Sequence, residues 1–404
     1  MYNKALIENI RKDFPGTSAE LDGAKVTYLD SAATTLKPQA MIDAINEYYG
    51  GISSNVHRGK NYSLELVSNR YENARYRVAE LISCSGNEVV FLRNTTEAIN
   101  LVASGLELTK EDRVLVCSDA HHSNFLPWME HANVDIVQPN DVGGLDMDHF
   151  MDLMKKRPKV VAITHCSNVT AVYNPIEMMI SEAKKVGAIT VVDAAQSVPH
   201  RKINVNELDV DFLTFSAHKL AGPTGVGILY GKQERLKALK PALFGGGMVD
   251  WVDNKGYRLR KIPHRFEAGT PNIAGAYGLG ASIDYLNKIG FELLESHDRD
   301  MGKYMLNKAM ERDYLEIINK DPNADRGAVV SFKVPTSPKL DDAARVLSDT
   351  YGIMCRNGHM CAQPYVDELA DSQILRISAY IYNTEEEIDY FFESLDEIST
   401  FLFY

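Results

Sequence analysis

Residues 211–231 read DFLTFSAHKLAGPTGVGILYG: an apolar strand, a polar segment from Ser216 to Lys219, a Gly/Pro turn and a second short apolar run. A lysine placed where a buried strand ends is desolvated, which lowers its pKa and supplies the neutral amine that condenses with an aldehyde. Lys219 therefore meets the requirement of a Schiff-base lysine. Taken alone, it would more often be a surface lysine after an edge strand, so the rest of the sequence decides.

Seven short apolar runs alternate with helix-period segments between about Val26 and Tyr230. They are EVVFLR, DRVLVCS, VDIVQ, KVVAITHCS, AITVVDAA, DFLTFS and GVGILYG. Continuous apolar strands separated by helices predict an α/β fold with a mostly parallel, seven-stranded sheet that is covered on both faces.

The pattern changes after Pro271 to long helical stretches, the strands LEIIN, VVSFKV and ILRISAY, and a closing helix. This change predicts a smaller C-terminal α+β domain. We expect an N-terminal segment (1–25) that packs with the small domain, a large domain over 26–288 and the small domain over 289–404. The Gly-rich segment 245–261 is expected to form an ordered loop or hairpin.

The composition is that of an ordinary globular protein: 404 residues, 45% hydrophobic and 24% charged. The net charge of -12 and the absence of a Lys/Arg run argue against nucleic acid and anionic membranes as partners. No stretch approaches the roughly 20 apolar residues of a membrane span, and the N-terminus does not resemble a signal peptide. Five cysteines without CxxC pairing argue against a disulfide framework. We expect a soluble, cytoplasmic protein.

Two polar residues follow the apolar run in AITVVDAAQS, where a parallel strand ends. At this edge of an α/β sheet, Asp193 is suited to pair with a protonated pyridine nitrogen and strengthen the ring as an electron sink. Gln196 is suited to donate to the phenolic oxygen of the same ring. Taken alone, Asp193 would be better explained as a helix N-cap.

The segment FLRNTTEAINLVA reads as a strand, a turn and a helix start, with Asn94 and Glu97 at capping-box spacing. The free N–H groups and dipole of a helix start suit a phosphate, and the Thr95 and Thr96 hydroxyls add donors. Capping and phosphate binding are compatible, so the capping pattern does not exclude a phosphate site. We therefore predict pyridoxal 5'-phosphate as cofactor from this segment together with Lys219 and the polar residues of AITVVDAAQS.

Three further residues have both a functional and a structural interpretation. His121 follows a strand and either stacks on the cofactor and moves protons or is an ordinary loop histidine. Arg376, on the strand ILRISAY, either pairs with a substrate carboxylate or forms a structural ion pair. Cys361, in the loop GIMCRNGHMCAQP, is either a thiolate favoured by Arg356 and His359 on a flexible loop or an inert small hydrophobe.

Other types of site fit the sequence poorly. Cys355, in a strand-like setting, is expected to be an inert small hydrophobe. Cys355, His359 and Cys361 have poor spacing for zinc, so we expect no metal. No GxxxxGK[ST] loop is present. Gly225, Gly227 and Gly231 have one residue too many for a dinucleotide fingerprint, which argues against a nicotinamide-dependent oxidoreductase.

Taken together, these segments resemble the class V aminotransferase family of fold-type I pyridoxal-phosphate enzymes, and within it the group II (SUF-type) cysteine desulfurases. The resemblance covers nearly the whole chain. Its motifs are YLDSAATTLKP, SSNVHRG, FLRNTTEAINLVA, HHSNFLPW, ITHCSNV, VDAAQS, SAHKLAGPTGVGILYG, RFEAGTPN, RNGHMCAQP and RISAYIYNT.

The resemblance implies a role for each matched residue. The cofactor residues are Lys219 on the aldehyde, Asp193 on the pyridine nitrogen, Gln196 on the phenolic oxygen, His121 stacked on the ring, Thr95, Thr96, Ser216 and His218 on the phosphate, and Thr270 reaching the phosphate from the partner subunit. The substrate residues are Asn168 and Arg376 on the carboxylate, with Arg356 nearby, and Cys361 as sulfur acceptor.

The resemblance also implies that this protein is a homodimer and that it converts L-cysteine, or L-selenocysteine, to L-alanine. It leaves a persulfide whose sulfur passes to an acceptor protein for iron–sulfur clusters or other products.

The sequence departs from the family pattern beside the substrate pocket and the reactive cysteine. Asn357 and Met360 replace a Thr and a His of the usual RTGHHCA, and Thr170-Ala171 replaces Leu-Gly after SNV. The sequence therefore does not identify the sulfur acceptor or the substrate. A selenocysteine lyase or another class V enzyme of a specialised pathway is the leading alternative, and a catalytically silent scaffold is the second.

Overall fold

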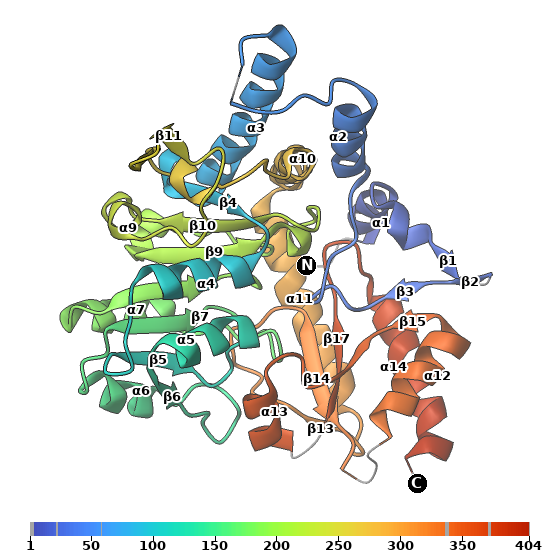
Figure 1. The fold of residues 1–404 in the computed structure, drawn as a ribbon. Helices are drawn as coiled ribbons and strands as arrows, with labels where there is room; N and C mark the ends of the chain where they lie inside the picture. The colour runs from blue at the N-terminus through green and yellow to red at the C-terminus, as the bar shows by residue number, and fades with distance from the viewer. Residues whose placement is uncertain (1–3, 22, 58, 336–338, 371–372, 404) are drawn as a thin grey trace.

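The computed structural model describes residues 4–21, 23–57, 59–335, 339–370 and 373–403. Arg58 of the SSNVHRG motif lies outside the described residues. A central sheet, a smaller sheet beside it and helices packed on both make up the molecule (Figure 1).

The central sheet has seven strands, in the order β4-β10-β9-β8-β7-β5-β6. Neighbours from β9 to β6 are parallel, whereas β10 runs antiparallel to both β4 and β9. The predicted mostly parallel, seven-stranded sheet is thus confirmed. The strands are β4 (Val89–Leu92), β5 (Arg113–Cys117), β6 (Asn133–Val137), β7 (Val160–Thr164), β8 (Ile189–Asp193), β9 (Phe212–Ser216) and β10 (Gly227–Gly231).

Both faces of this sheet are covered because alternate residues of its strands enter different apolar clusters. On one face, Val114, Val116 and Ala162 pack with α4 (Thr95–Gly105) and α5 (Leu126–His131). On the other, Leu115 and Ile163 share a cluster with residues of α3 (Tyr62–Leu81), α6 (Met147–Met154), α7 (Ile176–Lys185) and α10 (Ile273–Ile289). Burial on two faces explains why these strands are apolar without alternation.

The C-terminal part contains a four-stranded antiparallel sheet, in the order β13-β14-β17-β16, with its own apolar core. Its elements are α11 (Phe291–Met310), β13 (Glu316–Ile317), β14 (Val329–Lys333), α12 (Leu340–Tyr351), β15 (Ile353–Met354), β16 (Arg356–Gly358), α13 (Gln363–Ala370), β17 (Ile374–Ser378) and α14 (Glu385–Leu402).

The N-terminal region contacts this C-terminal part. Strand β3 (Thr27–Tyr28) pairs in parallel with β15, and Arg11 of α1 (Lys4–Lys12) donates to Glu387 of α14 at 2.7 Å. The domain boundaries at 25 and 288 stay predictions.

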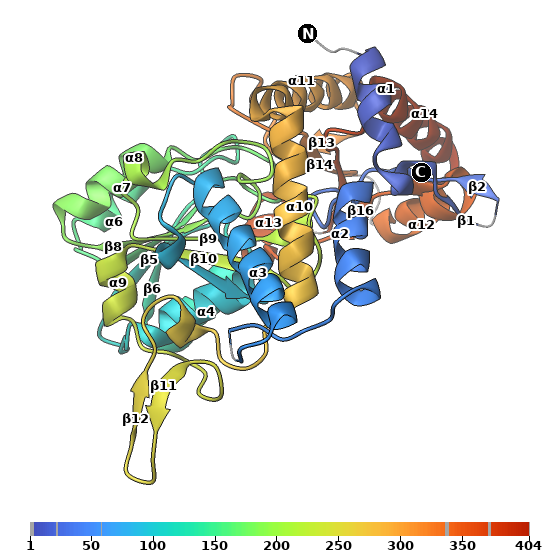
Figure 2. The same cartoon turned by 90° about the horizontal axis from the view of Figure 1, so that it is seen from above.

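The segment 245–261 forms a hairpin of β11 (Val249–Val252) and β12 (Tyr257–Leu259), as predicted, and this hairpin projects from the body of the molecule (Figure 2). No helix in the described part of the chain is long and apolar enough to span a membrane. The remaining elements are β1 (Glu20–Leu21), β2 (Ala24–Lys25), α2 (Gln39–Gly50), α8 (Val205–Leu208) and α9 (Gln233–Ala238).

Candidate active site

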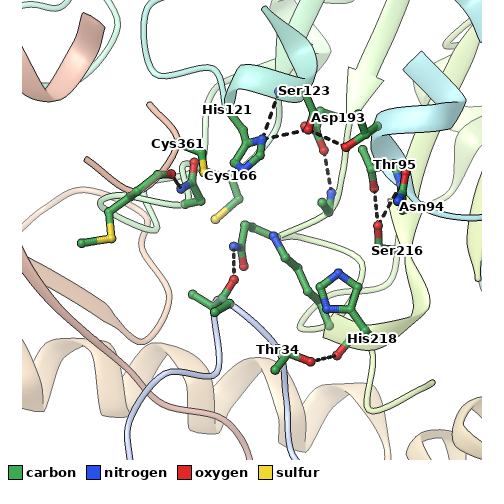
Figure 3. A pocket seen from close by; sticks show the side chains of 18 of the residues that line it. Thr34, Asn94, Thr95, His121, Ser123, Cys166, Asp193, Ser216, His218 and Cys361 are labelled. Atoms are coloured by element: carbon green, nitrogen blue, oxygen red, sulfur yellow. Dashed lines mark hydrogen bonds between the residues drawn. The ribbon is translucent and has the colours of Figure 1, made fainter. Parts of the chain in front are cut away.

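A cavity of about 390 Å³ lies where the central strands β7, β8 and β9 end, and the smaller sheet completes its wall (Figure 3). It brings together residues from distant parts of the sequence. Of the residues proposed from the sequence it is lined by Thr95, Thr96, His121, Asn168, Asp193, Gln196, Ser216, His218, Lys219, Arg356, Cys361 and Arg376. Thr270 is not among its lining residues.

Lys219 ends a short 3-10 turn (Ala217–Lys219) that follows β9 directly. Burial lowers the pKa of this amine to about 8, although the nearby Asp193 carboxylate opposes the shift. About one-tenth of the amine is then neutral at pH 7, against about 0.04% for an ordinary lysine. The position therefore supplies a nucleophilic amine near neutral pH.

The carbonyl oxygen of His218, one residue before Lys219, accepts hydrogen bonds from three residues of the YLDSAATTLKP motif. Lys37 Nζ donates at 2.7 Å, Thr34 Oγ1 at 3.1 Å, and both the N–H and Oγ1 of Thr35 at 3.1 Å. Burial lowers the pKa of Lys37 to about 7. These bonds fix the turn that carries Lys219, and the sequence analysis quoted the motif without assigning it this role.

Asp193 is the last residue of β8 and is buried. Its Oδ1 accepts the N–H of Ala195 at 3.0 Å. Burial raises the pKa of the carboxyl, whereas the backbone N–H of Ala195 and the charge of Lys219 lower it. Gln196 is also buried, and its Nε2 donates to the carbonyl of Ala32 at 2.8 Å. The strand end thus presents a carboxylate and an anchored amide to the cavity.

The start of α4 also lines the cavity. The Asn94 side chain caps this helix by accepting the N–H of Glu97 at 2.9 Å. The N–H of Thr95 donates to Ser216 Oγ at 2.9 Å, and Thr96 Oγ1 lies 2.7 Å from Ser123 Oγ. Hydroxyls and a helix dipole form a donor set suited to a phosphate. Ser123, in the motif HHSNFLPW, was not predicted.

Gly227 of β10 lies directly beneath this helix start. A Cβ at this position would stand 2.3 Å from Cα of Asn94, and backbone cannot yield as a flexible side chain can. We expect Gly227→Ala to destabilise the fold by about 1–3 kcal/mol and, by displacing the helix start, to weaken pyridoxal-phosphate binding at least about tenfold. Urea denaturation and cofactor titration of the cofactor-free protein measure both effects.

Gly256→Ala is the matched control, because a Cβ there meets nothing within 4 Å. Unchanged stability and affinity in Gly227→Ala would show that the helix start tolerates the displacement.

His121 caps the short turn before α5, and its Nδ1 accepts the N–H of Ser123 at 3.1 Å. Burial, followed by the charge of Lys219, lowers the pKa of the imidazole to about 4. The ring is therefore neutral at pH 7 and carries its proton on Nε2, which suits a ring stacked over the cofactor.

Arg376 is buried on β17 and is fixed from two sides. Its Nη1 donates to the carbonyl of Asn168 at 2.8 Å and its Nη2 to Asp30 at 3.0 Å, while its buried Nε has no hydrogen-bond partner. Arg356 Nη2 also donates to Asp30, at 2.9 Å. Arg376 thus forms the structural ion pair and keeps one unused donor, and its pairing with a substrate carboxylate stays a prediction. Asp30, which orients both guanidinium groups, was not predicted.

The loop of Cys361 is tied to the cavity wall. The N–H of His122 donates to the carbonyl of Cys361 and Asn168 Nδ2 to that of Met360, both at 2.7 Å. Met360 and Cys361 both have left-handed backbone, with φ of 52° and 54°. The Cys361 side chain is exposed, so its sulfur is accessible from the cavity and from solvent.

The two departures beside Cys361 have structural contacts. Met360 is buried with Val169, Tyr365 and Val366, and Asn357 donates to Asp341. Burial raises the pKa of the Cys355 thiol to about 12, in agreement with an inert cysteine.

Thr270 lies on a second cavity, of about 190 Å³, together with His57 and Gly247. The prediction that it serves a partner subunit's phosphate stays a prediction.

The first cavity fits pyridoxal phosphate. Its lining combines a buried carboxylate, a donor set of hydroxyls at a helix start and a lysine with a low pKa. The buried, unpartnered Nε of Arg376 leaves a donor for a carboxylate.

The chain has close relatives among known proteins. A probable cysteine desulfurase of Halalkalibacterium halodurans is 39% identical, covering 96% of this chain and 97% of that protein. A cysteine desulfurase of Haloferax volcanii is 39% identical, with 96% of each covered. Among solved structures, the apo cysteine desulfurase of Thermococcus onnurineus is 38% identical with a TM-score of 0.91, covering 98% of both chains.

The cysteine desulfurase CsdA of Escherichia coli, in its S-sulfonic acid form, is 33% identical with a TM-score of 0.89 over the whole of both chains. The Aminotransferase class-V family model matches residues 27–391. The chain therefore belongs to the class V aminotransferase family and has its pyridoxal-phosphate fold.

Proposed function

We propose that this protein is a pyridoxal-phosphate-dependent cysteine desulfurase, which converts L-cysteine to L-alanine and holds the sulfur on Cys361 as a persulfide. The observation that carries the proposal is one cavity that presents Lys219, Asp193, Arg376 and an accessible Cys361 together. Full-length relatives that are named cysteine desulfurases support it.

In this proposal Thr95, Thr96, Ser216 and His218 would hold the phosphate of the cofactor and Asp193 would pair with its ring nitrogen. Gln196 would donate to its phenolic oxygen, His121 would cover its ring and Lys219 would bond to its aldehyde. When bound, the cofactor supplies an electron sink for a carbanion at the substrate α-carbon.

The protein's own groups hold the substrate and move its proton. Arg376, fixed by Asp30, donates to the substrate carboxylate from its unused Nε, and the anchored Asn168 borders the same place. The amine of Lys219, with its low pKa, takes the α-proton. Neutral His121 covers the reacting centre without adding a positive charge.

Cys361 then forms the new sulfur bond. Its sulfur attacks the sulfur of the substrate, the substrate carbon–sulfur bond breaks, and the pair of electrons of that bond stays with the carbon. That carbon is protonated, so one thiol and one cysteine give one persulfide and one alanine. No external oxidant or reductant is needed for this half of the reaction.

We expect the rate at which the cofactor-free protein captures pyridoxal phosphate to rise with pH, with a midpoint near 8. Below its pKa the Lys219 amine is protonated and has no lone pair for the aldehyde, and above it the amine is neutral. Stopped-flow absorbance between pH 6 and 10 measures the profile. A midpoint near the value of an ordinary lysine, about 10.4, would contradict the lowered pKa.

The function is tested by incubating the holoenzyme with cysteine or selenocysteine, measuring alanine, and mapping persulfide by mass spectrometry. A persulfide on Cys361 formed together with alanine from cysteine supports the proposal. Alanine without that persulfide would identify a lyase, and a protein that neither binds pyridoxal phosphate nor forms alanine would identify a silent scaffold.

We further propose a cytoplasmic homodimer that passes its sulfur to an acceptor protein. The exposed side chain of Cys361 supports access by a second protein. The position of Thr270 outside the cavity supports the dimer, because a contribution to a phosphate site then has to be made to another subunit. Sedimentation velocity of wild-type holoenzyme tests the dimer directly.

A further inference from the structure

A cluster of two histidines and one glutamate lies beside the second cavity, outside the residues used above. His57, Glu72 and His264 each offer one ligand atom, and these atoms all lie within 4.8 Å of one another. His57 and His264 also line the cavity of about 190 Å³, which leaves room for water or another ligand next to them. It is the one such group of metal-ligand type among the residues that the structure describes.

The three side chains come from three separate segments and are held in place. Glu72 lies on α3, His264 begins a 3-10 turn (His264–Phe266), and His57 lies in the loop before α3 with left-handed backbone, φ 65°. The His57 and His264 rings are 5.1 Å apart, and His57 Nε2 lies 2.7 Å from Glu72 Oε1. The juxtaposition is thus built by the fold and not by adjacent residues.

The carboxylate of Glu72 is ionised and oriented. Burial would raise its pKa, but the hydrogen bonds of His57 and Arg75 and the charge of Arg75 lower it to about 2. Arg75 Nε donates to Oε2 at 2.8 Å and Arg75 Nη2 to Oε1 at 3.3 Å, and Oε1 also lies 2.7 Å from His57 Nε2. Ligating carboxylates are commonly held by such an outer hydrogen bond.

His264 has an unmet bonding capacity. Its Nδ1 is buried and makes no hydrogen bond, and its nearest charged neighbour, Glu267 Oε2, is 3.6 Å away. Glu267 is itself engaged by Arg75 Nη1 at 2.6 Å and by the N–H of Phe91 at 2.8 Å. The ring nitrogen thus has only a long contact to a carboxylate that other donors already occupy, and a metal on the imidazole would be a stronger partner.

We infer that His57, Glu72 and His264 bind a divalent transition-metal ion of the Zn²⁺ type. Two imidazoles and one carboxylate are a common ligand set for Zn²⁺, and the cavity provides the open fourth position. The bound ion connects the loop before α3, helix α3 and the turn that precedes Thr270. The cavity is also lined by Thr270, which the proposed function assigns to the partner subunit's phosphate, so the inference is tested by metal binding and not by turnover.

Calorimetric titration of the holoenzyme with Zn²⁺ alone tests the site, after alkylation of the thiols so that Cys361 does not bind the metal. We expect one ion per chain. His57→Gln and His264→Gln should each weaken binding at least about 100-fold, since even outer-shell changes cost 10–100-fold. His131→Gln, on α5, is the matched control and should bind like wild type.

The change in melting temperature on adding Zn²⁺ is a second measurement, which can be compared between variants that differ in stability. The melting temperature should rise with Zn²⁺ in wild type and His131→Gln, but not in the two site variants. Absence of saturable binding in the alkylated wild type would overturn the inference. Retention of wild-type affinity in either site variant would overturn the three-ligand assignment.

Discussion

Lys219→Ala is expected to abolish covalent attachment of the cofactor and to lower alanine formation at least about 1000-fold. Among the described residues, Lys219 is the one lysine that lines the cavity, and its amine both bonds the aldehyde and takes the α-proton. The methyl group of alanine can do neither. Borohydride reduction followed by peptide mass spectrometry locates the attached cofactor, and an alanine assay measures turnover.

Lys240→Ala is the control for this substitution, because Lys240 is an exposed lysine paired with Glu107 on the surface. It should leave both measurements unchanged. If Lys219→Ala still carried a reducible cofactor on another lysine and turned over cysteine, the assignment of Lys219 would be wrong.

Cys361→Ser is expected to remove the enzyme persulfide and to lower alanine release from cysteine at least about 100-fold. A hydroxyl keeps the size of the thiol but is a far poorer nucleophile toward sulfur, so binding should survive while sulfur transfer is lost. The holoenzyme should still bind its cofactor, because Thr95 and Thr96 of the phosphate donor set bond to Ser216 and Ser123 and not to Cys361. Persulfide mapping and initial rates measure the effect.

The control is Cys84→Ser. Burial raises the pKa of the Cys84 thiol to about 12, and Cys84 does not line the cavity. Full-rate alanine release by Cys361→Ser without added reductant would contradict the persulfide mechanism.

The sequence allowed the sheet to be predicted better than its strand directions. A strand buried on two faces is apolar throughout, so each run was visible, but an apolar run is the same whether its neighbour is parallel or antiparallel. The reversed direction of β10 follows from the short Gly/Pro connection between Ser216 and Gly227. Such a tight connection joins antiparallel strands, whereas parallel strands need a longer crossover.

The candidate site was predictable where its residues follow strands. Asp193 and Lys219 end or follow adjacent parallel strands, whose carboxyl ends meet at one edge. Asp30 was not predictable, because its ion pair with Arg376 joins residues 346 positions apart, and neither residue carries a local signal of the other. The role of Lys37 was not predictable either. Its partner is the backbone carbonyl of His218, which is distant in the sequence and has no side-chain signal.

The departures from the family pattern near Cys361 show a different limit. Met360 lies in an apolar cluster where a polar side chain would lose hydration, and Asn357 bonds to Asp341 on α12. A single sequence shows that these residues differ from the family pattern, but not which residues they contact.

The pairing of Asp30 with Arg376 also bears on how the protein is made. A ribosome adds about 5–20 residues per second, so Asp30 emerges on the order of tens of seconds before the guanidinium that it will hold. Strand β3, which lies beside Asp30, is synthesised a similar time before its pairing partner β15. The nascent chain can fold its central sheet early, but Asp30 can pair with Arg376 only after β17 has emerged. Truncated chains should therefore keep the phosphate end of the cavity and lack the end that recognises the amino acid.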